Sequence, residues 1–332
     1  MQLLQRLCAF VVVAAVSAAA AGESNEIAVA QQYGVSFLPL MVMERDKLVE
    51  KHAKAAGLGE VRVNWVKVAG PSMMNDGMIG GSLQFISVGA PSLITLWDKT
   101  GGAVKGMSAM TTYPLYLVTR NPAVKSVRDL SDKDKIVVPS VKVSTQAIML
   151  QMVAAKEYGD ANWAHYDPWT VTLSHPDGYL ALMNNTAGIN AHFSSSPFYE
   201  QEIKLPGARV LTTNYEILGG PATAVVIAAS SKYRDANPKS YKAFFDALSE
   251  AIESINKDKR GAAKVYLEQA KDTKNSVEDI YAIIAAKDYA YTLTPQKVYR
   301  TAEFMHKIGT VKNRPGSWKD LFFPEVQHLS GD

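Results

Sequence analysis

The sequence predicts an α/β protein made of two units. Segments with strand-like composition alternate with segments whose apolar residues follow the helical period, which is the pattern of a parallel sheet covered by helices. The same pattern starts again near residue 126. The chain has 332 residues, and a single hydrophobic core stops growing at about 250–300 residues, so two domains are expected.

The first unit begins at residue 27. Val61, Val63 and Trp65 alternate as in a half-buried strand, and Gly57 is suited to end the helix before them. Pro91 opens a helix, because its missing N–H costs nothing at that position. The expected strands are 27–30, 61–68 and 83–88, and the expected helices are 38–56, 72–80 and the segment from Pro91.

The second unit follows a turn at residues 126–130. Its expected strands are 135–139, 169–173 and 189–193, and its expected helices are 144–157 and 177–184. An apolar, β-branched strand is then expected at 222–229, followed by helices at 238–256, 261–269, 277–286 and 295–308. No Gly/Ser-rich or Pro-rich linker separates the two units, so we expect strands that cross between them.

The N-terminal segment is typical of a secretory signal peptide. Arg6 lies in a polar start, residues 7–20 are almost entirely apolar, and small residues fill 17–22. The apolar run of about 14 residues is shorter than the roughly 20 that span a bilayer. We therefore expect residues 1–21 to be removed by cleavage near Ala20–Gly22 and the protein to be periplasmic.

The cysteine content excludes several kinds of chemistry. Cys8 is the one cysteine, and it lies within the expected signal peptide at the start of the apolar run, which argues against a lipid anchor. The remaining chain then has no thiol for a disulfide, a zinc site or a nucleophile. The net charge is +3, without a basic cluster, so nucleic acid is not an expected partner.

Catalytic and metal-binding motifs are missing from the sequence. It contains no G-x-S-x-G, H-E-x-x-H or phosphate loop. The runs His165-Tyr166-Asp167 and His175-Pro176-Asp177 flank the expected strand 169–173, so they point to opposite ends of it and fit turns better than one metal site. We expect no catalytic residue, metal or cofactor.

Three polar loops of small residues follow expected strands. They are 87–92, the start of the helix at Ser144-Thr145-Gln146, and 194–197. Ligands of α/β proteins bind at the carboxyl ends of strands, and helix N-termini favour anions. Simple N-capping by Ser144 also explains the second loop. Pro91 and Pro197 each lie seven residues after an amide residue, which suggests equivalent loops in the two units.

Two parts of the chain carry recognisable motifs. Asp129-Leu130, Lys133 and 135–139 resemble D-L-x-x-K-x-K-(I/V)-x-V-P, and a C-terminal signature is formed by 291–295, Phe304-Met305, Gly309 and 317–322. In these motifs the chain resembles the solute-binding proteins of nitrate/sulfonate/taurine-type ABC importers, which include binders of thiamine precursors, and the resemblance spans the chain after the signal peptide. Gln84 and Asn190 stand where the family often has Asp.

The resemblance implies the two-lobed periplasmic binding protein fold of type II. Lobe I is expected to hold residues 27–116 and 222–332, and lobe II residues 117–221, with two crossing strands near 113–118 and 219–225. The solute is held in the cleft and enclosed by hinge closure. The implied partners are a small polar or anionic organic solute (a sulfonate, nitrate, carboxylate or heterocycle) and the membrane permease of an importer, and the binding protein is expected to be a monomer.

The candidate ligand-binding residues come from both expected lobes. Glu216 would suit a solute with a donor or positive group and conflicts with a pure anion. The candidates are Gln31, Tyr33, Gly89, Ala90, Ser92, Tyr113, Ser144, Thr145, Gln146, His192, Ser194 and Glu216.

Two other functions remain open at this level. One is an exported ligand sensor that feeds a signalling partner. The other is an enzyme similar to the thiamine-pyrimidine synthases, but those depend on a cysteine-rich motif, which residues 22–332 do not contain.

Overall fold

The computed structural model describes residues 23–332. The expected signal peptide, its cleavage site and Cys8 lie outside this range. Within residues 23–332, no helix has the length and apolar character needed to cross a membrane.

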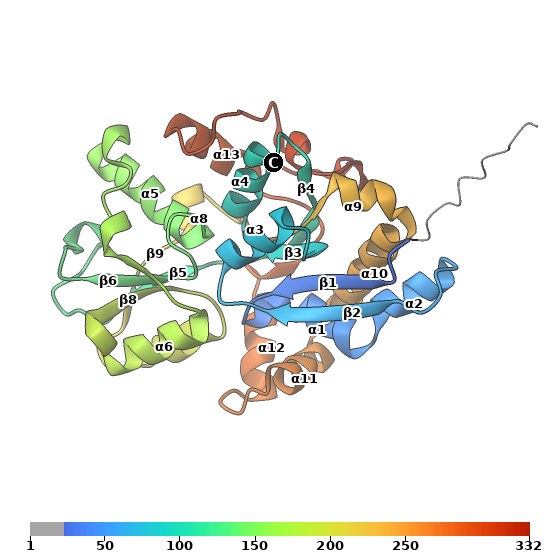
Figure 1. Ribbon diagram of the computed structural model, residues 1–332. Coiled ribbons are helices and arrows are strands. Elements are labelled where there is room, and N and C mark those ends of the chain that lie inside the picture. The colour runs from blue at the N-terminus through green and yellow to red at the C-terminus, as the bar shows by residue number, and fades with distance from the viewer. Residues whose placement is uncertain (1–22) are drawn as a thin grey trace, which may run out of the picture.

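The described chain forms two separate sheets, each with its own helices (Figure 1). The first sheet has six strands in the order β11-β4-β10-β3-β1-β2, and the second has five in the order β7-β6-β8-β5-β9. The first comprises β1 (Glu26–Gln31), β2 (Arg62–Lys67), β3 (Phe85–Val88), β4 (Val104–Thr112), β10 (Thr223–Ser230) and β11 (Ala290–Tyr291). The second comprises β5 (Tyr116–Thr119), β6 (Lys135–Val138), β7 (Thr170–Thr172), β8 (Ile189–Ser194) and β9 (Arg209–Thr213).

The two sheets share one topology at their centres. In the first, β1 lies between β2 and β3, both parallel to it, and β10 pairs antiparallel with β3. In the second, β6 lies between β7 and β8, both parallel to it, and β5 pairs antiparallel with β8. Each sheet thus has three parallel strands next to a strand that enters from the other sheet. The α/β class with two sheets is confirmed.

The chain passes between the sheets twice. It leaves the first sheet at the end of β4 and enters the second at β5, after residues 113–115. It returns from β9 to β10 through the short helix α8 (Asn214–Leu218). We call the first sheet with its helices lobe I and the second lobe II. The exact lobe boundaries stay a prediction.

Helices cover the faces of both sheets (Figure 1). Lobe I carries α1 (Leu38–Arg45), α2 (Leu48–Ala55), α3 (Pro71–Ile79), α4 (Ala90–Lys99), α9 (Ser231–Ala236), α10 (Pro238–Lys257), α11 (Lys259–Ala270), α12 (Val277–Ala285) and α13 (Val298–Lys307). Lobe II carries α5 (Thr145–Tyr158), α6 (His175–Asn184) and α7 (Phe198–Glu202). The core of lobe I includes a stack of Phe85 from β3 on Phe244 from α10, with ring centroids 3.8 Å apart.

Two features differ from the sequence-based expectation. The single helix expected at 38–56 is two helices, because Lys47 adopts a left-handed backbone with φ of 50° between α1 and α2. Strands β4, β9 and β11 fall outside the expected strands. The stretch Gly106–Thr112 of β4 is fully buried, so it lacks the alternation of apolar and polar residues that marks a half-buried strand.

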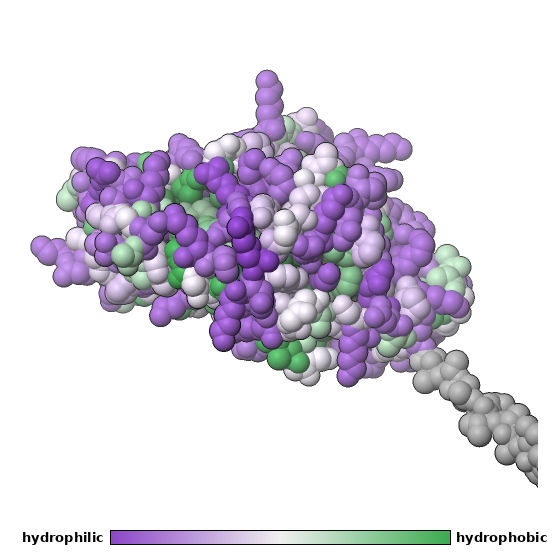
Figure 2. Space-filling model, turned by 90° about the horizontal axis from the view of Figure 1, so that it is seen from above, coloured by the Kyte–Doolittle hydropathy of each residue, from purple (hydrophilic) through white to green (hydrophobic). Residues whose placement is uncertain are grey.

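The surface seen from above is mostly hydrophilic, with scattered hydrophobic spots (Figure 2). Large hydrophobic side chains that remain exposed are Tyr33, Val66, Met73, Ile79 and Leu180. Scattered single residues of this kind are normal on a globular surface and mark no binding face by themselves.

Candidate functional site

The candidate site is the cleft where the two lobes meet. Gln32 follows β1 and Gly89 follows β3 on the lobe I side, while Pro139 follows β6 on the lobe II side. Carboxyl ends of parallel strands from both sheets therefore converge on one place, which is where α/β folds bind ligands. The space enclosed there is about 30 Å³.

The lobes are in direct contact around this space. The Val35 N–H donates to Ser196 O at 3.3 Å, and the Ser72 N–H donates to Ser140 Oγ at 3.3 Å. A Cβ on Gly89 would lie 2.0 Å from Thr145 Oγ1, so glycine is what lets this loop approach α5. The structure is therefore a closed arrangement of the lobes.

Gly70 makes a second close approach of the same kind. A Cβ on this residue would lie 2.1 Å from Pro139 O. Backbone of lobe I thus packs on backbone of lobe II at the rim of the cleft. Any larger side chain at residue 70 would hold the lobes apart.

The N-terminus of α5 faces the cleft. Ser144 is the N-cap: its Oγ accepts from the Ala147 N–H at 3.3 Å and donates to Ser140 O at 2.7 Å. Thr145 and Gln146 form the first turn and line the cleft. Within residues 23–332, the buried Thr145 Oγ1 has no hydrogen-bond partner, so it is free to bond a solute. Partial positive charge at this helix end also favours negative groups.

A chain of buried polar side chains lies behind α5 in lobe II. Gln146 Nε2 is 3.3 Å from His175 Nε2, His175 Nδ1 is 2.9 Å from His192 Nε2, and His192 Nδ1 is 2.6 Å from Glu202 Oε1. His175 lines the cleft, whereas His192 and Glu202 have no exposed surface. His192 therefore belongs to the site only through His175.

Tyr113 lies at the first crossing between the lobes and lines the cleft. Its ring stacks on Tyr289 with centroids 5.1 Å apart. Burial raises the pKa of Tyr113 to about 12, so the phenol stays neutral at physiological pH and can donate a hydrogen bond. Tyr113 thus offers both a ring and a donor.

Four expected site residues lie near the cleft but do not line its enclosed space. Gln31 is buried at the end of β1, and its Nε2 donates to Glu44 Oε2 at 3.5 Å. Ala90 and Ser92 are buried in the first turn of α4, where Ser92 Oγ donates to Asn75 Oδ1 at 2.6 Å. Ser194 is buried at the end of β8. These residues support the walls of the cleft.

Tyr33 lines a neighbouring cavity of about 310 Å³ and is partly exposed. That cavity also involves Phe198 and Pro176 of lobe II and Lys274 of lobe I. It therefore forms a second gap at the same junction between the lobes.

Glu216 lies apart from the cleft, so the structure does not place it with the other candidates. It is the third residue of α8, and its carboxylate accepts from the Thr213 N–H at 2.9 Å and from Thr212 Oγ1 at 2.9 Å. This is an N-terminal capping box, which accounts for the glutamate without a ligand.

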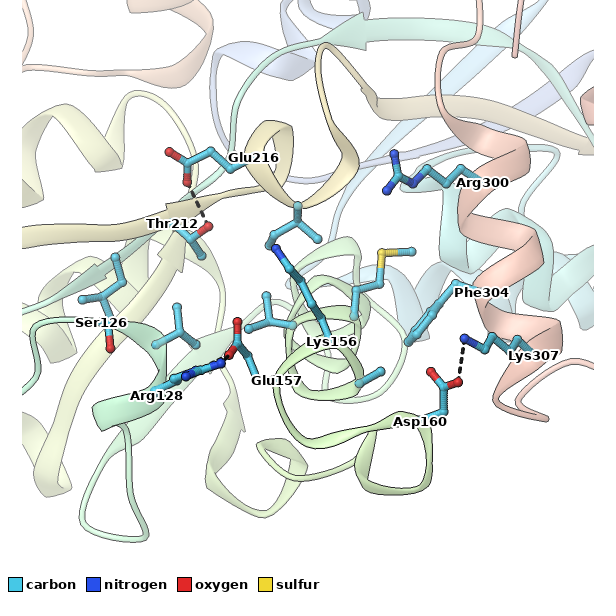
Figure 3. Close-up of a pocket in the computed structure, with 16 residues that line it drawn as sticks. Ser126, Arg128, Lys156, Glu157, Asp160, Thr212, Glu216, Arg300, Phe304 and Lys307 are labelled. Atoms are coloured by element: carbon cyan, nitrogen blue, oxygen red, sulfur yellow. Dashed lines mark hydrogen bonds and ion pairs between the residues drawn. The ribbon is translucent and has the colours of Figure 1, made fainter.

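Glu216 lines a larger groove of about 570 Å³ between α5 and α13 (Figure 3). Arg300 and Lys307 of α13 and Lys156 of α5 also lie there. The Lys307 ammonium pairs with Asp160 at 2.6 Å across the lobes. Both partners are largely exposed, so this pair holds the lobes together only weakly.

The cleft carries no strong charge of its own. Among the described residues that line it, there is no Asp, Glu, Lys or Arg. Its polar groups are amides, hydroxyls and one imidazole, together with the end of α5. This set can hold a small polar solute or an anion through hydrogen bonds and a helix end. Within residues 23–332, no group of three or more His, Cys, Asp or Glu is placed to hold a metal ion.

The sequence interpretation missed His175, Gln32 and Phe37 as cleft residues. Gln32 directly follows β1, between the expected residues Gln31 and Tyr33, and Phe37 ends the short turn 35–37 before α1. The run His175-Pro176-Asp177 was interpreted as a turn, and it forms the first turn of α6, which Ser174 caps. No sequence signal indicates that His175 meets His192.

No protein-family model matches this sequence, and no curated protein does either. Solved structures do share the fold. The alkanesulfonate-binding protein SsuA from Xanthomonas axonopodis pv. citri, bound to MOPS, is 17% identical with a TM-score of 0.69, over 89% of this chain and 96% of the other.

Two further structures agree with this fold. The aliphatic sulphonate-binding protein SsuA from Escherichia coli is 16% identical with a TM-score of 0.64, over 93% and 95% of the two chains. The nitrate-binding protein NrtA from Synechocystis PCC 6803 is 15% identical with a TM-score of 0.66, over 90% and 85%. All three are described as binding proteins, and two as periplasmic. The chain thus has the periplasmic binding protein fold, as expected.

Proposed function

We propose that this protein is the periplasmic solute-binding component of an ABC importer. It captures a small polar or anionic organic solute between its lobes and presents the closed form to a permease. The single observation that carries the proposal is the cleft itself: two lobes joined by two crossings enclose the N-terminus of α5 with Thr145, Gln146, His175 and Tyr113.

The enclosed volume makes lobe movement a requirement of this function. The space of about 30 Å³ has room for ordered water only. Ligand pockets are typically about 300–1,000 Å³. An organic solute therefore enters only when the lobes separate, and it is held when they close again around it. The resemblance in fold to sulfonate- and nitrate-binding proteins supports small anions, sulfonates and nitrate, as the first candidates.

A thermal-shift screen over sulfonates, nitrate, carboxylates, amines and heterocycles tests the proposal. A solute that binds only the folded protein stabilises it by about 2.7 kcal/mol when its concentration is a hundred times Kd, and this raises the melting temperature. We expect at least one class of solute to raise the melting temperature, and we expect calorimetry to give one binding site per chain. Stabilisation that persists unchanged when residue 145 is altered would place binding outside the cleft.

Genomic context separates the importer from a sensor. Genes for a permease and an ATPase beside this gene support transport. A gene for a signalling protein in their place would contradict it.

A further inference from the structure

Three buried side chains of lobe II form a line from its interior to the cleft. Glu202, His192 and His175 are joined by contacts of 2.6 Å and 2.9 Å, and Gln146 adjoins the last imidazole at the cleft wall. The exposed fractions are 0% for Glu202 and His192 and 6% for His175. A buried carboxyl group is thereby connected to the surface that a solute contacts.

The packing around this line fixes both imidazoles. A Cβ on Gly178 of α6 would lie 2.9 Å from His192 Cε1, so glycine gives His192 room to reach His175. On the other side, Phe198 lies nearly parallel to the His175 ring, at 16° and 6.1 Å. Val118 and Val137 flank His192 on the neighbouring strands. Neither ring can turn away without breaking this packing.

The number of protons on these three side chains decides the direction of the hydrogen bonds between them. With Glu202 ionised and both imidazoles neutral, His192 donates from Nδ1 to Glu202 and His175 donates from Nδ1 to His192. Nε2 of His175 is then an acceptor for the NH₂ group of Gln146, 3.3 Å away. With one more proton on the line, the hydrogen bonds between Glu202, His192 and His175 reverse, and Nε2 of His175 becomes a donor that the NH₂ group of Gln146 cannot accept and a solute in the cleft can.

We infer that Glu202, His192 and His175 act as a proton relay, so that an anionic solute is captured together with about one proton. This inference rests on the proposed solute-binding function. The proton enters at Nε2 of His175, the Nδ1 proton of His175 passes to Nε2 of His192, and the Nδ1 proton of His192 passes to Glu202. No bond between heavy atoms changes, and the charge of the line rises from −1 to 0.

Electrostatics favour this uptake. An anion in a cleft without Lys or Arg adds a second negative charge near the buried Glu202 carboxylate, and like charges at low dielectric repel strongly. Within the described residues, Glu202 Oε2 has no hydrogen-bond partner. Burial, and then His192, hold the pKa of His175 well below its usual value, so a positive charge does not stay on His175 and the proton moves inward.

Other charged groups around the relay act in the same direction or lie further out. On α7, burial and then the nearby Glu202 raise the pKa of Glu200; a second carboxyl group there disfavours the ionised relay. Asp177 on α6 is hydrogen-bonded to Ser174. Further charged groups near these elements are Lys204 after α7, Asp134 bonded to Asn190 of β8, Arg120 after β5, which donates to the Leu182 carbonyl of α6, and Lys274 over Tyr179 of α6.

Calorimetry with two probes, ethanesulfonate and nitrate, tests the linkage. Titrations at one pH in Bis-Tris and in imidazole buffer, which differ in ionisation enthalpy, give the number of protons bound. For the wild-type protein we expect about one, and affinity that falls up to tenfold per unit rise in pH. Glu202→Gln should bring the proton number to zero and flatten the pH profile. Proton uptake that persists in Glu202→Gln would overturn the inference.

A matched control comes from the other histidine–carboxylate pair. His52 Nε2 lies 2.7 Å from Glu250 Oε2 in lobe I, far from the cleft lining. His52→Gln should leave the proton number and the pH profile of binding as in the wild type. A change equal to that of Glu202→Gln would mean that the linkage is not a property of the relay.

Nitrogen-15 NMR of labelled histidines tests the relay without any solute. We expect His175 and His192 to carry their protons on Nδ1 at high pH and to move together to the Nε2 form on acidification. In Glu202→Gln this joint change should be lost. Independent titration of the two imidazoles would overturn the relay. If neither probe binds the wild type but the joint change occurs, the solute class is wrong and the relay stands.

Discussion

Ser144 and Thr145 are neighbours at the start of α5, but their hydroxyl groups have different tasks. Ser144 Oγ makes two hydrogen bonds within lobe II and caps the helix. Thr145 Oγ1 is buried at the cleft against the Gly89 loop of lobe I. The sequence left capping and binding as alternatives for this loop; the structure assigns the cap to Ser144, and we propose that Thr145, its neighbour, contacts the solute.

Thr145→Ala should weaken solute binding without lowering stability much. The expected loss is about 1–3 kcal/mol of binding free energy, the usual cost of a missing hydrogen bond to a buried or charged group. Ser144→Ala is the matched control, because it removes the cap and should lower the free energy of unfolding by about 0.5–2 kcal/mol. Calorimetry and thermal melts of both variants measure the difference. Equal affinity of Thr145→Ala and wild type would remove this hydroxyl from the site.

At the residue scale, the sequence predicted only part of the site. Gly89, Tyr113, Ser144, Thr145 and Gln146 were expected and do line the cleft. His175 was missed because its partners are remote in sequence: Gln146 is 29 residues away and His192 is 17 residues away. Only the packing of α5, α6 and β8 brings these together. Glu216 was expected at the cleft but lies in the capping box of α8, and a capping glutamate and a binding glutamate look alike in sequence.

At the scale of elements, α10 holds the helical layer of lobe I to its sheet. Phe244 is fully buried against Phe85, and the helix also packs on α1 and α2. The amphipathic pattern of α10 was predictable, with Pro238 at its start. The break between α1 and α2 could not be predicted, because neither Gly nor Pro marks it and Lys47 adopts the left-handed backbone there.

Phe244→Ala should destabilise the protein by about 3–5 kcal/mol, because it leaves a cavity beneath α10. Phe245 on the same helix is only half-buried, so Phe245→Ala should cost clearly less. Urea unfolding of the two variants gives the comparison. Equal losses would mean that α10 does not dock through this stack.

The contact of α2 with α10 should depend on pH. The hydrogen bond from Lys51, assisted by His52, holds the pKa of Glu250 below its usual value. A carboxyl group with a lowered folded pKa adds stability above its unfolded pKa of about 4.3, and this stability is lost as pH falls through the folded pKa.

Glu250→Gln should therefore reduce stability slightly at pH 7 and have less effect near pH 3. The change is small because the pair is partly exposed. Thermal melts from pH 3 to pH 7 measure it, with Glu253→Gln, an exposed position on the same helix, as the control. An effect that grows toward low pH would contradict the assignment.

At the scale of the whole molecule, the two lobes are closed around a space too small for an organic solute. The two-sheet α/β class followed from the repeated order of strands and helices. The contacts between the lobes could not be predicted from the sequence, because they join residues that are remote in sequence. Examples are Gly70 against Pro139 and Val35 against Ser196. Solute capture by this protein therefore requires that the lobes open to admit the solute and close upon it.

Small-angle X-ray scattering, with and without a solute that raises the melting temperature, tests this claim most directly. Without solute, the radius of gyration should exceed the value calculated from the closed structure. With saturating solute, it should decrease toward that value, and Thr145→Ala should need more solute to do so. Identical scattering curves in the absence and presence of a tightly bound solute would contradict capture by lobe closure.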